Sequence, residues 1–398
     1  MNQSHEAPTA RVATRCRSKL TAKAAPVMAL AVCCLLGEQA AQARVVIPLG
    51  DDDQWVSVGF GLRPFFSDVT RNHAAGTNPD RVDLESFRVF SSASFNQYLK
   101  ATFNTQIDNN NSMQIIDGIG QFEPMDEINV WGGRMLPPSD RANLDGPYYL
   151  LGWSYPGVVS RYPGRAAGRL DGGAVWGKLF DKRLVYVFGA YSGHNDIVGA
   201  SNISGNPLFA GRVTYNFLDP DPAPAYYTGS TYYGSADILA LGFAVQHQQD
   251  GVGTQFRRGD FTAWNADLLF EKKLGEFGVA TFEGAYYRYY TQGVTDVATT
   301  FNNARSTDLV GGIRPGEAFM LGAGYLTPFT IGWGKLQPYF RYQQFRDTLA
   351  ATVERQYDMG VTYVINGHDL RITANYAINQ FTARKDVDKF ILGLQVQF

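Results

Sequence analysis

The residues of this sequence best suited to recognise a charged partner are arginines in one long irregular stretch, 135–171. Guanidinium groups stay charged at any ordinary pH and offer planar donors that fit carboxylate and phosphate. The stretch contains no lysine. Its arginines and aspartates, counting the arginine at its root, are Arg134, Arg141, Arg161, Arg165, Arg169, Asp140, Asp145 and Asp171. A site that binds or passes anions is one function that this composition suits.

Segments in which apolar and polar residues alternate lie on both sides of this stretch. Such alternation indicates strands, and about ten residues suffice for a tilted strand to cross a bilayer. We predict sixteen strands, at 54–62, 82–93, 98–107, 113–122, 126–134, 172–180, 184–193, 208–217, 237–248, 262–273, 278–290, 316–326, 335–346, 353–365, 369–380 and 388–398. The predicted fold class is all-β, a transmembrane antiparallel β-barrel of about 16 strands, closed because an open edge in lipid leaves backbone groups unpaired.

The polar faces of several predicted strands carry charged residues. Four of them are Arg212, Asp267, Asp358 and Arg371. A barrel interior packed only with side chains would not accept these charges, so we expect a water-filled lumen with the four residues on its wall. Their mixed signs predict a modest selectivity.

The links between the predicted strands differ in length. The short links at 180–183, 274–277 and 365–368 are predicted to be periplasmic turns. The longer links at 194–207, 218–236, 249–261 and 291–315 are rich in Gly, Asn, Asp, Pro and Ser and are predicted to be extracellular loops. The stretch 135–171 is the longest link and follows the fifth predicted strand. Prolines and aromatic residues stiffen it.

The first 43 residues are predicted to be a signal peptide that is cleaved after export. Basic residues precede an apolar run from Ala24 to Leu36, and Ala41-Gln42-Ala43 forms a small-x-small cleavage site. The apolar run is too short to span a bilayer, which takes about 20 residues. Residues 44–398 follow as one domain, the predicted barrel.

Cysteine usage and charge argue against several classes of function. All three cysteines, Cys16, Cys33 and Cys34, lie in the predicted signal, so residues 44–398 offer no disulfide, thiol nucleophile or cysteine-bound metal. We therefore expect no cofactor and no metal. Residues 44–398 carry 30 Lys and Arg against 35 Asp and Glu, which gives no support to nucleic-acid binding. No Gly-x-Ser-x-Gly motif is present, and we do not expect an enzyme.

The last predicted strand carries apolar side chains on one face. They are Phe390, Leu392, Leu394, Val396 and Phe398. A final strand of this kind, ending in Phe, resembles the closing strand of bacterial outer-membrane β-barrels. The resemblance implies that these residues form the signal read by the barrel assembly machinery, and that the protein lies in the outer membrane of a Gram-negative bacterium.

The segment before the arginine-rich stretch completes a wider resemblance. It reads Asp126-Glu127-Ile128-Asn129-Val130-Trp131-Gly132-Gly133-Arg134-Met135-Leu136-Pro137-Pro138. With the signal, the strands and the chain end, it resembles the bacterial outer-membrane porin superfamily, closest to the phosphate-selective porin O and P family. This implies that the stretch folds into the lumen as a constriction, and that the protein is a homotrimer amid lipid and lipopolysaccharide. Phosphate-selective members use lysines, which the stretch lacks, so phosphate selectivity is not carried over.

Three roles remain open for the arginines of 135–171. They can line a constriction for anions, they can pair with aspartates and wall acids to hold the stretch in place, or they can face lipopolysaccharide or water outside. Different arginines can serve the first two roles together. We expect ion transport by passive diffusion of small anionic or neutral hydrophilic solutes, with a mild anion preference. The alternative is a barrel that sheathes or supports a partner, such as a periplasmic or surface electron-transfer protein.

Overall fold

The computed structural model describes residues 44–50, 53–72, 80–108, 112–164, 167–193, 200–202, 205–295 and 313–398. The chain divides into two units, Met1–Gln39 and Ala40–Phe398, and all described residues belong to the second. The predicted signal peptide, 1–43, and Arg165 lie outside the described residues.

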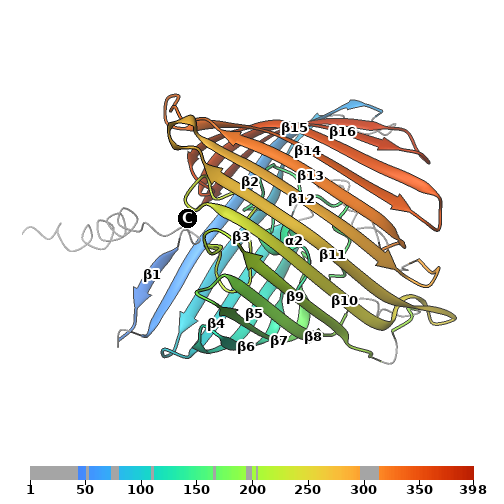
Figure 1. The fold of residues 1–398 in the computed structure, drawn as a ribbon, viewed down its shortest axis with the longest axis horizontal. Coiled ribbons are helices and arrows are strands. Elements are labelled where there is room, and N and C mark those ends of the chain that lie inside the picture. Colours follow the sequence, from blue (N-terminus) through green and yellow to red (C-terminus); the bar gives the residue numbers. More distant parts are fainter. Residues whose placement is uncertain are drawn as a thin grey trace, which may run out of the picture. The chain divides into compact units, whose positions relative to one another are not determined.

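Sixteen strands of the second unit form one closed antiparallel sheet (Figure 1). Each strand pairs with the next along the chain, and the last, β17, pairs with the first of the ring, β2. The strands are β2 (Trp55–Arg71), β3 (Asp80–Ser94), β4 (Leu99–Asp108), β5 (Met113–Met125), β6 (Ile128–Met135), β7 (Leu170–Leu179), β8 (Leu184–Tyr191), β9 (Leu208–Asn216), β10 (Ile238–Thr254), β11 (Arg257–Lys273), β12 (Val279–Tyr290), β13 (Gly316–Leu326), β14 (Lys335–Asp347), β15 (Thr352–Asn366), β16 (Leu370–Phe381) and β17 (Val387–Gln397). The predicted β-barrel is confirmed.

The strand that starts the ring is longer than predicted. β2 continues beyond the expected 54–62 as far as Arg71, and β17 pairs only with its part from Gly61 onward. A short strand that was not predicted, β1 (Val45–Pro48), pairs with the beginning of β2. Phe398 and Phe60 exchange backbone hydrogen bonds of 2.6 and 2.8 Å. These contacts cover the part of the β2 edge that β17 leaves open, so the end of the chain does close the barrel.

The predicted loop 249–261 is mostly strand in the structure. β10 and β11 pair as a long hairpin that turns between Thr254 and Arg257, with a register shift between Gln248 and Val252. Asp250 and the nearby glycines break the alternation, which is why this part of the sequence has a loop-like composition. A β-bulge lets the ladder continue past such a break.

The links alternate between the two ends of the barrel, and the C-terminus marks the end on the left of Figure 1. The three short links that were predicted to be turns lie at this end. The link between β9 and β10 also lies there, because two strands separate it from the turn at 180–183. The prediction placed 218–236 with the loops at the other end, and the order of the strands corrects it.

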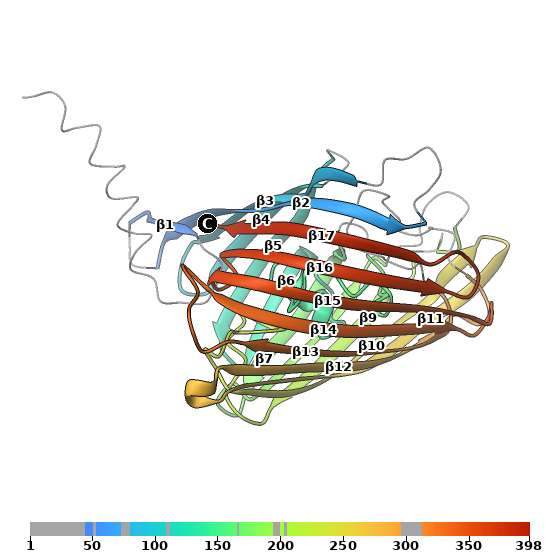
Figure 2. The same cartoon turned by 90° about the horizontal axis from the view of Figure 1, so that it is seen from above.

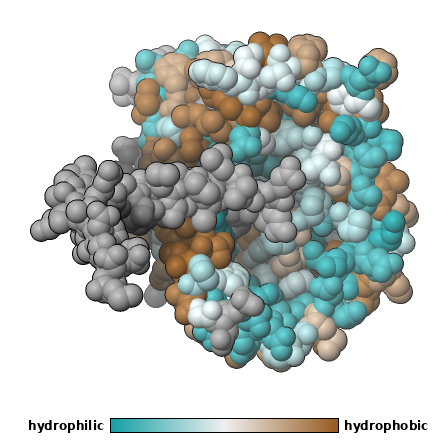
Figure 3. All heavy atoms as spheres, turned by 90° about the vertical axis from the view of Figure 1, so that its left-hand side faces the viewer, coloured by the Kyte–Doolittle hydropathy of each residue, from teal (hydrophilic) through white to brown (hydrophobic). Residues whose placement is uncertain are grey.

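The outward face of the barrel is apolar. In β10, for example, Leu241, Phe243 and Val245 are between 43% and 51% exposed, whereas the inward Ala240 and Ala244 are fully buried. Figure 3 looks onto the end that faces left in Figure 1 and shows hydrophobic residues along much of its upper margin. Among the described residues, no helix is long and apolar enough to cross a membrane.

Candidate functional site in the barrel interior

The segment 136–169 links β6 to β7, and its described residues, 136–164 and 167–169, lie inside the barrel (Figure 2). They contain one helical turn, α2 (Arg141–Asp145), and are otherwise irregular. Their side chains reach opposite parts of the wall, since Tyr148 lies 3.1 Å from Ser86 of β3 and Tyr162 donates to Asn265 of β11. The expectation that the link after the fifth barrel strand folds inward is confirmed.

Wall arginines bind the backbone of this segment. Four of them donate to its carbonyl groups: Arg63 to Pro147 (2.5 Å) and Trp153 (2.7 Å), Arg212 to Ser139 (3.0 Å), Arg341 to Ser154 (2.7 Å), and Arg371 to Leu150 (2.8 Å) and Tyr148 (3.2 Å). Irregular backbone has no ladder to satisfy its carbonyls, and a buried carbonyl without a donor is costly. These arginines therefore stabilise the inward position of the segment.

Glycines of the wall make room for the large side chains of the segment. A Cβ atom at Gly393 of β17 would lie 2.5 Å from the ring of Trp153, and one at Gly61 of β2 would lie 2.7 Å from Tyr148. Both aromatic side chains are about 1% exposed. The segment thus packs against this part of the wall at van der Waals distance, without intervening water.

The residues at the start of α2 were predicted to line a constriction. Arg141 donates to the carbonyl of Gly229 at 2.8 Å and pairs with Asp221 at 3.2 Å. Burial acts to lower the pKa of Arg141, but the attraction of Asp221 and other nearby acids outweighs it, so this pKa stands above its usual value. Arg141 therefore remains charged and is held by acids from another part of the chain.

The two aspartates that flank Arg141 are also buried. Asp140 accepts hydrogen bonds from Ser160 and Tyr287, both at 2.9 Å, and burial raises its pKa to about 6. Asp145 accepts a hydrogen bond from Ser230, and burial raises its pKa well above the usual value. Neither carboxylate faces open water, so both serve as acceptors within the packed interior.

Two further arginines of the segment pair with acids of the wall. Arg161 contacts Glu354 of β15 at 2.6 Å and lies 3.6 Å above the ring of Phe345. Arg169 contacts Asp117 of β5 at 3.1 Å. Of the three roles left open by the sequence, this geometry is the one in which arginines hold the segment in place.

Arg134 lies elsewhere. It sits on the outward face of β6, since its neighbours Trp131 and Met135 face inward and are buried. It forms a two-pronged ion pair with Asp171 of β7, with distances of 2.6 and 2.9 Å. The structure thus separates Arg134 from Arg141, Arg161 and Arg169, which it brings into the interior.

The four residues predicted for the lumen wall all face inward. Arg212 and Asp267 form two hydrogen bonds of 2.6 and 2.7 Å, and Asp358 accepts from Arg341 at 3.0 and 3.1 Å. Arg371 binds the segment as described above. All four are at most 3% exposed. The sequence predicted a water-filled surface here, but the inserted segment covers it.

Three cations at the inner wall, Arg44, Arg88 and Lys100, were not predicted. Together with the predicted Arg169 of the inserted segment they form a set that we call the basic track. Arg88 donates from Nε to Gln106 at 2.7 Å, and Arg44 donates to Ser92 at 2.6 Å. Lys100 is about a third exposed. Arg88 alternates with Ser86 and Phe90 on the inward face of β3, so the pattern of that strand contained a signal for it.

The surroundings of the basic track are partly open. Ser92, Thr102 and Gln106, which line it, are half-buried. Because a strand rises about 3.3 Å per residue, Arg88 and Ser94, the residue that pairs with Lys100, lie roughly 20 Å apart. The track thus follows β3 and β4 over most of the length needed to cross a bilayer.

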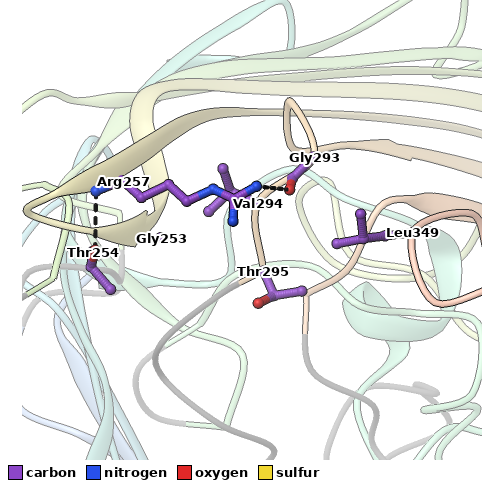
Figure 4. A pocket seen from close by; sticks show the side chains of 7 residues that line it. All are labelled: Gly253, Thr254, Arg257, Gly293, Val294, Thr295 and Leu349. Carbon is purple, nitrogen blue, oxygen red and sulfur yellow. Dashed lines mark hydrogen bonds between the residues drawn. The ribbon is translucent and has the colours of Figure 1, made fainter.

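A depression at the end of the barrel opposite the C-terminus has a volume of about 270 Å³ (Figure 4). Its one charged lining residue, Arg257, already donates to Gly293 at 3.3 Å. Within the described ranges, no cluster of three or more His, Cys, Asp or Glu side chains is placed to hold a metal ion. The interior remains the better candidate for a functional site.

Solved structures share this fold at low sequence identity. An anion-selective porin from Comamonas acidovorans is 14% identical, with a TM-score of 0.56 over 86% of this chain and 99% of that one. OmpT of Vibrio cholerae, in a trimer form, is 13% identical, with a TM-score of 0.53 over 87% and 100%. OmpF of Salmonella typhi is 12% identical, with a TM-score of 0.53 over 88% and 100%.

No protein-family model and no curated protein matches the sequence. The similarity to these three structures concerns the fold, a closed antiparallel β-barrel that outer-membrane proteins adopt.

Proposed function

We propose that this chain is an outer-membrane channel through which small hydrophilic solutes, anionic or neutral, diffuse passively with a mild preference for anions. The barrel fold supports a channel, and the observation that carries the anion preference is the basic track. Lys100 and Arg169 are each paired with a carboxylate, at 2.7 and 3.1 Å. In the described part of the chain, Arg44 and Arg88 have no carboxylate within ion-pair distance.

The track therefore has two cations that form no ion pair with a carboxylate of the described residues. The terminal nitrogens of Arg88 make no hydrogen bond with any described residue, and its Cζ lies 5.2 Å from the Tyr148 ring. A guanidinium edge that is not used by the protein can bind a passing carboxylate or phosphate. Many other interior charges are paired, which keeps the field and the expected selectivity modest.

The loop arginines enter this proposal in a reduced role. Arg141, Arg161 and Arg169, together with Asp140 and Asp145, shape the constriction by fixing the segment that narrows it. The field along the pore comes from the track. The segment is held against the wall by the predicted wall residues Arg212, Asp267, Asp358 and Arg371 and their hydrogen bonds.

Single-channel recording in a planar bilayer under a KCl gradient tests the proposal. The purified, refolded protein should give stable conductance steps with a reversal potential that favours chloride. A reversal potential that favours potassium would contradict the anion preference, but the protein would still be a channel. A correctly folded barrel without any steps would contradict the channel itself.

We also propose that the protein is a homotrimer in the outer membrane, amid lipid and lipopolysaccharide. The trimer form of OmpT, which shares the fold, supports this state. Mass measurement of the detergent complex by light scattering tests it, and a monomer in several mild detergents would contradict it.

The barrel assembly machinery would read the apolar face of β17, formed by Phe390, Leu392, Leu394, Val396 and Phe398. Leu392 is 45% exposed on the outside, as this role requires. Deletion of Phe398 should lower the amount of folded barrel in the outer membrane.

We do not propose the alternative of a sheath for an electron-transfer partner. A sheath needs an interior that accepts another protein, whereas residues 136–164 of this chain pack against the wall there. The hydrogen bonds from Arg341 and Arg371 to the segment occupy the surface that a partner would need.

A further inference from the structure

A second segment enters the barrel interior from the end at which the C-terminus lies. It is the link 218–237 between β9 and β10, which we call the lower segment. Ala223 accepts a hydrogen bond from Lys178 of β7 at 3.1 Å, while the carbonyl of Thr231 lies 2.9 Å from His368 in the turn between β15 and β16. Because these contacts lie on separate parts of the wall, the lower segment crosses the lumen.

Polar contacts fix the crossing part of the lower segment. Glu271 of β11 accepts hydrogen bonds from the side chain of Thr231 at 2.6 Å and from the backbone amides of Tyr232 and Gly234 at 2.9 Å. The Tyr233 and His368 rings lie 4.7 Å apart. Burial lowers the pKa of His368 to about 3, so this contact stays neutral at ordinary pH. The lower segment is thus a structured part of the interior.

The lower segment also binds the segment 136–169 directly. Six hydrogen bonds join them: Tyr226 to the carbonyl of Leu136 (2.8 Å), Thr228 to the carbonyl of Arg141 (3.0 Å), Arg141 to the carbonyl of Gly229 (2.8 Å) and to Asp221 (3.2 Å), the amide of Ser230 to the carbonyl of Tyr149 (3.0 Å), and the hydroxyl of Ser230 to Asp145. Each segment therefore supplies partners for the irregular backbone of the other.

Arg141 is at the centre of this contact. It belongs to the segment 136–169 and is 4% exposed, and one of its partners, Asp221, belongs to the lower segment. Its Nε and Nη2 atoms have no hydrogen-bond partner among the described residues, and Arg141 borders a cavity of about 10 Å³ that Ser230 and Glu283 also line. A cavity of this size holds about one water molecule. The contact between the two segments therefore leaves no room for a solute, although not every donor of Arg141 has an acceptor among the described residues.

The base of the lower segment is closed independently of its crossing part. The amide of Asp219 donates to the carbonyl of Asp237 at 2.9 Å, and the amide of Asp237 donates to the carboxylate of Asp219 at 2.8 Å. Residues 220–236 thus leave and rejoin the β9–β10 hairpin at one point. They are not part of the strand pairing between β9 and β10, so their role lies in the lumen.

We propose that the lower segment is a second constriction element, which narrows the pore from the end of the C-terminus and is joined to the first at Arg141. The size limit of the channel then depends on both segments, and not only on the link after the fifth barrel strand. This inference rests on the proposed channel function.

The test is to replace 220–236 with Asn-Gly, a pair that forms a two-residue hairpin turn between neighbouring strands. Single-channel conductance in KCl should rise roughly two- to threefold, because the pore loses one of its two narrowing elements. Liposome swelling should extend to larger sugars. A folded, heat-modifiable variant with the same conductance and the same sugar limit as the natural chain would overturn the proposal.

Point variants keep the test valid if the shortened chain does not fold. Arg141→Ala and Ser230→Ala should each raise conductance by a smaller factor, because each removes bonds between the two segments but leaves both in place. Arg346→Ala is the matched control, since this arginine is 64% exposed and contacts Glu317 on the outside. A rise with Arg346→Ala equal to that of the other variants would overturn the role of the contact. If neither the natural chain nor any folded variant conducts, the channel function itself is wrong.

Discussion

The two sides of the barrel interior use the same type of residue differently. On the inner face of β14–β16, Arg341 and Arg371 are at most 2% exposed and donate to backbone carbonyls of the segment 136–169. Along β3 and β4, the basic track has Lys100 about a third exposed and Arg88 with unused terminal nitrogens. An arginine in a barrel interior is therefore not by itself part of a filter.

This difference follows from where irregular backbone lies. A segment without a ladder needs donors for its carbonyls, and the wall that it touches supplies them from arginine and glutamine. Gln395, for instance, donates to the carbonyl of Tyr148 at 2.9 Å. On the side of β3 and β4 the charges are not used for carbonyls of the segment: Lys100 is about a third exposed, and the terminal nitrogens of Arg88, a residue that is 5% exposed, make no hydrogen bond with any described residue.

The largest effect is expected at the ion pair between Arg212 and Asp267. Arg212→Ala should lower the free energy of unfolding by about 3–5 kcal/mol, because it leaves the Asp267 carboxylate buried without its cation. Replacing both residues with methionine should cost much less. Thermal unfolding in detergent, followed by circular dichroism, measures both variants. Equal losses in the single and the double variant would contradict this account of the packed side.

A smaller effect is expected where the wall makes room for Trp153. Gly393→Val puts side-chain atoms where the indole lies, since a Cβ alone would be 2.5 Å from it. We expect this overpacking to lower the free energy of unfolding by about 1–3 kcal/mol. Gly132→Val is the control, because a Cβ at Gly132 meets nothing within 4 Å. Thermal unfolding in detergent should show this loss of stability only in the first variant, and equal losses in both would count against the dry contact.

A milder effect is expected from pH. Packing raises the pKa of Asp140 from 3.8 to about 6, with Tyr287, Asp267 and Arg212 facing it. Asp140 therefore binds a proton more tightly when the segment is packed than when the segment is released. Protonation stabilises the packed state as the pH falls through about 6, and this stabilisation increases no further below 3.8. Conductance should be lower at pH 5 than at pH 7.5.

The substitution Asp140→Asn removes the titrating group and should abolish this dependence. The account would be contradicted if acidification raised the conductance of the natural chain but not that of Asp140→Asn, because the effect of protonation would then be opposite to the expected one.

The sequence predicted the barrel better than it predicted the interior. Alternation identified all the strands of the ring, because lipid outside and polar groups inside impose it on every one of them. It did not place Arg134, since Gly132 and Gly133 precede it and carry no side chain from which to read a face. Arg88 lies on the polar face of its strand and could have been predicted from the alternation. The prediction chose the arginine-rich stretch 135–171 instead.

The position of the lower segment could have been obtained by counting strands. Length and composition assigned 218–236 to the outside, whereas alternation of the strands from the closing β17 places it at the end of the C-terminus. Which arginines pair with which acids could not be predicted. Those pairs depend on how two irregular segments meet, as Arg141 and Asp221 do at 3.2 Å, and no periodic pattern encodes that meeting.

The most direct test of the central claim is the reversal potential of Arg44→Gln with Arg88→Gln under a KCl gradient. The account predicts that the natural chain favours chloride and that the double variant loses this preference or favours potassium, with its conductance steps intact. Arg346→Gln is the matched control and should leave the potential unchanged. An unchanged chloride preference in the double variant would contradict the basic track as the origin of selectivity.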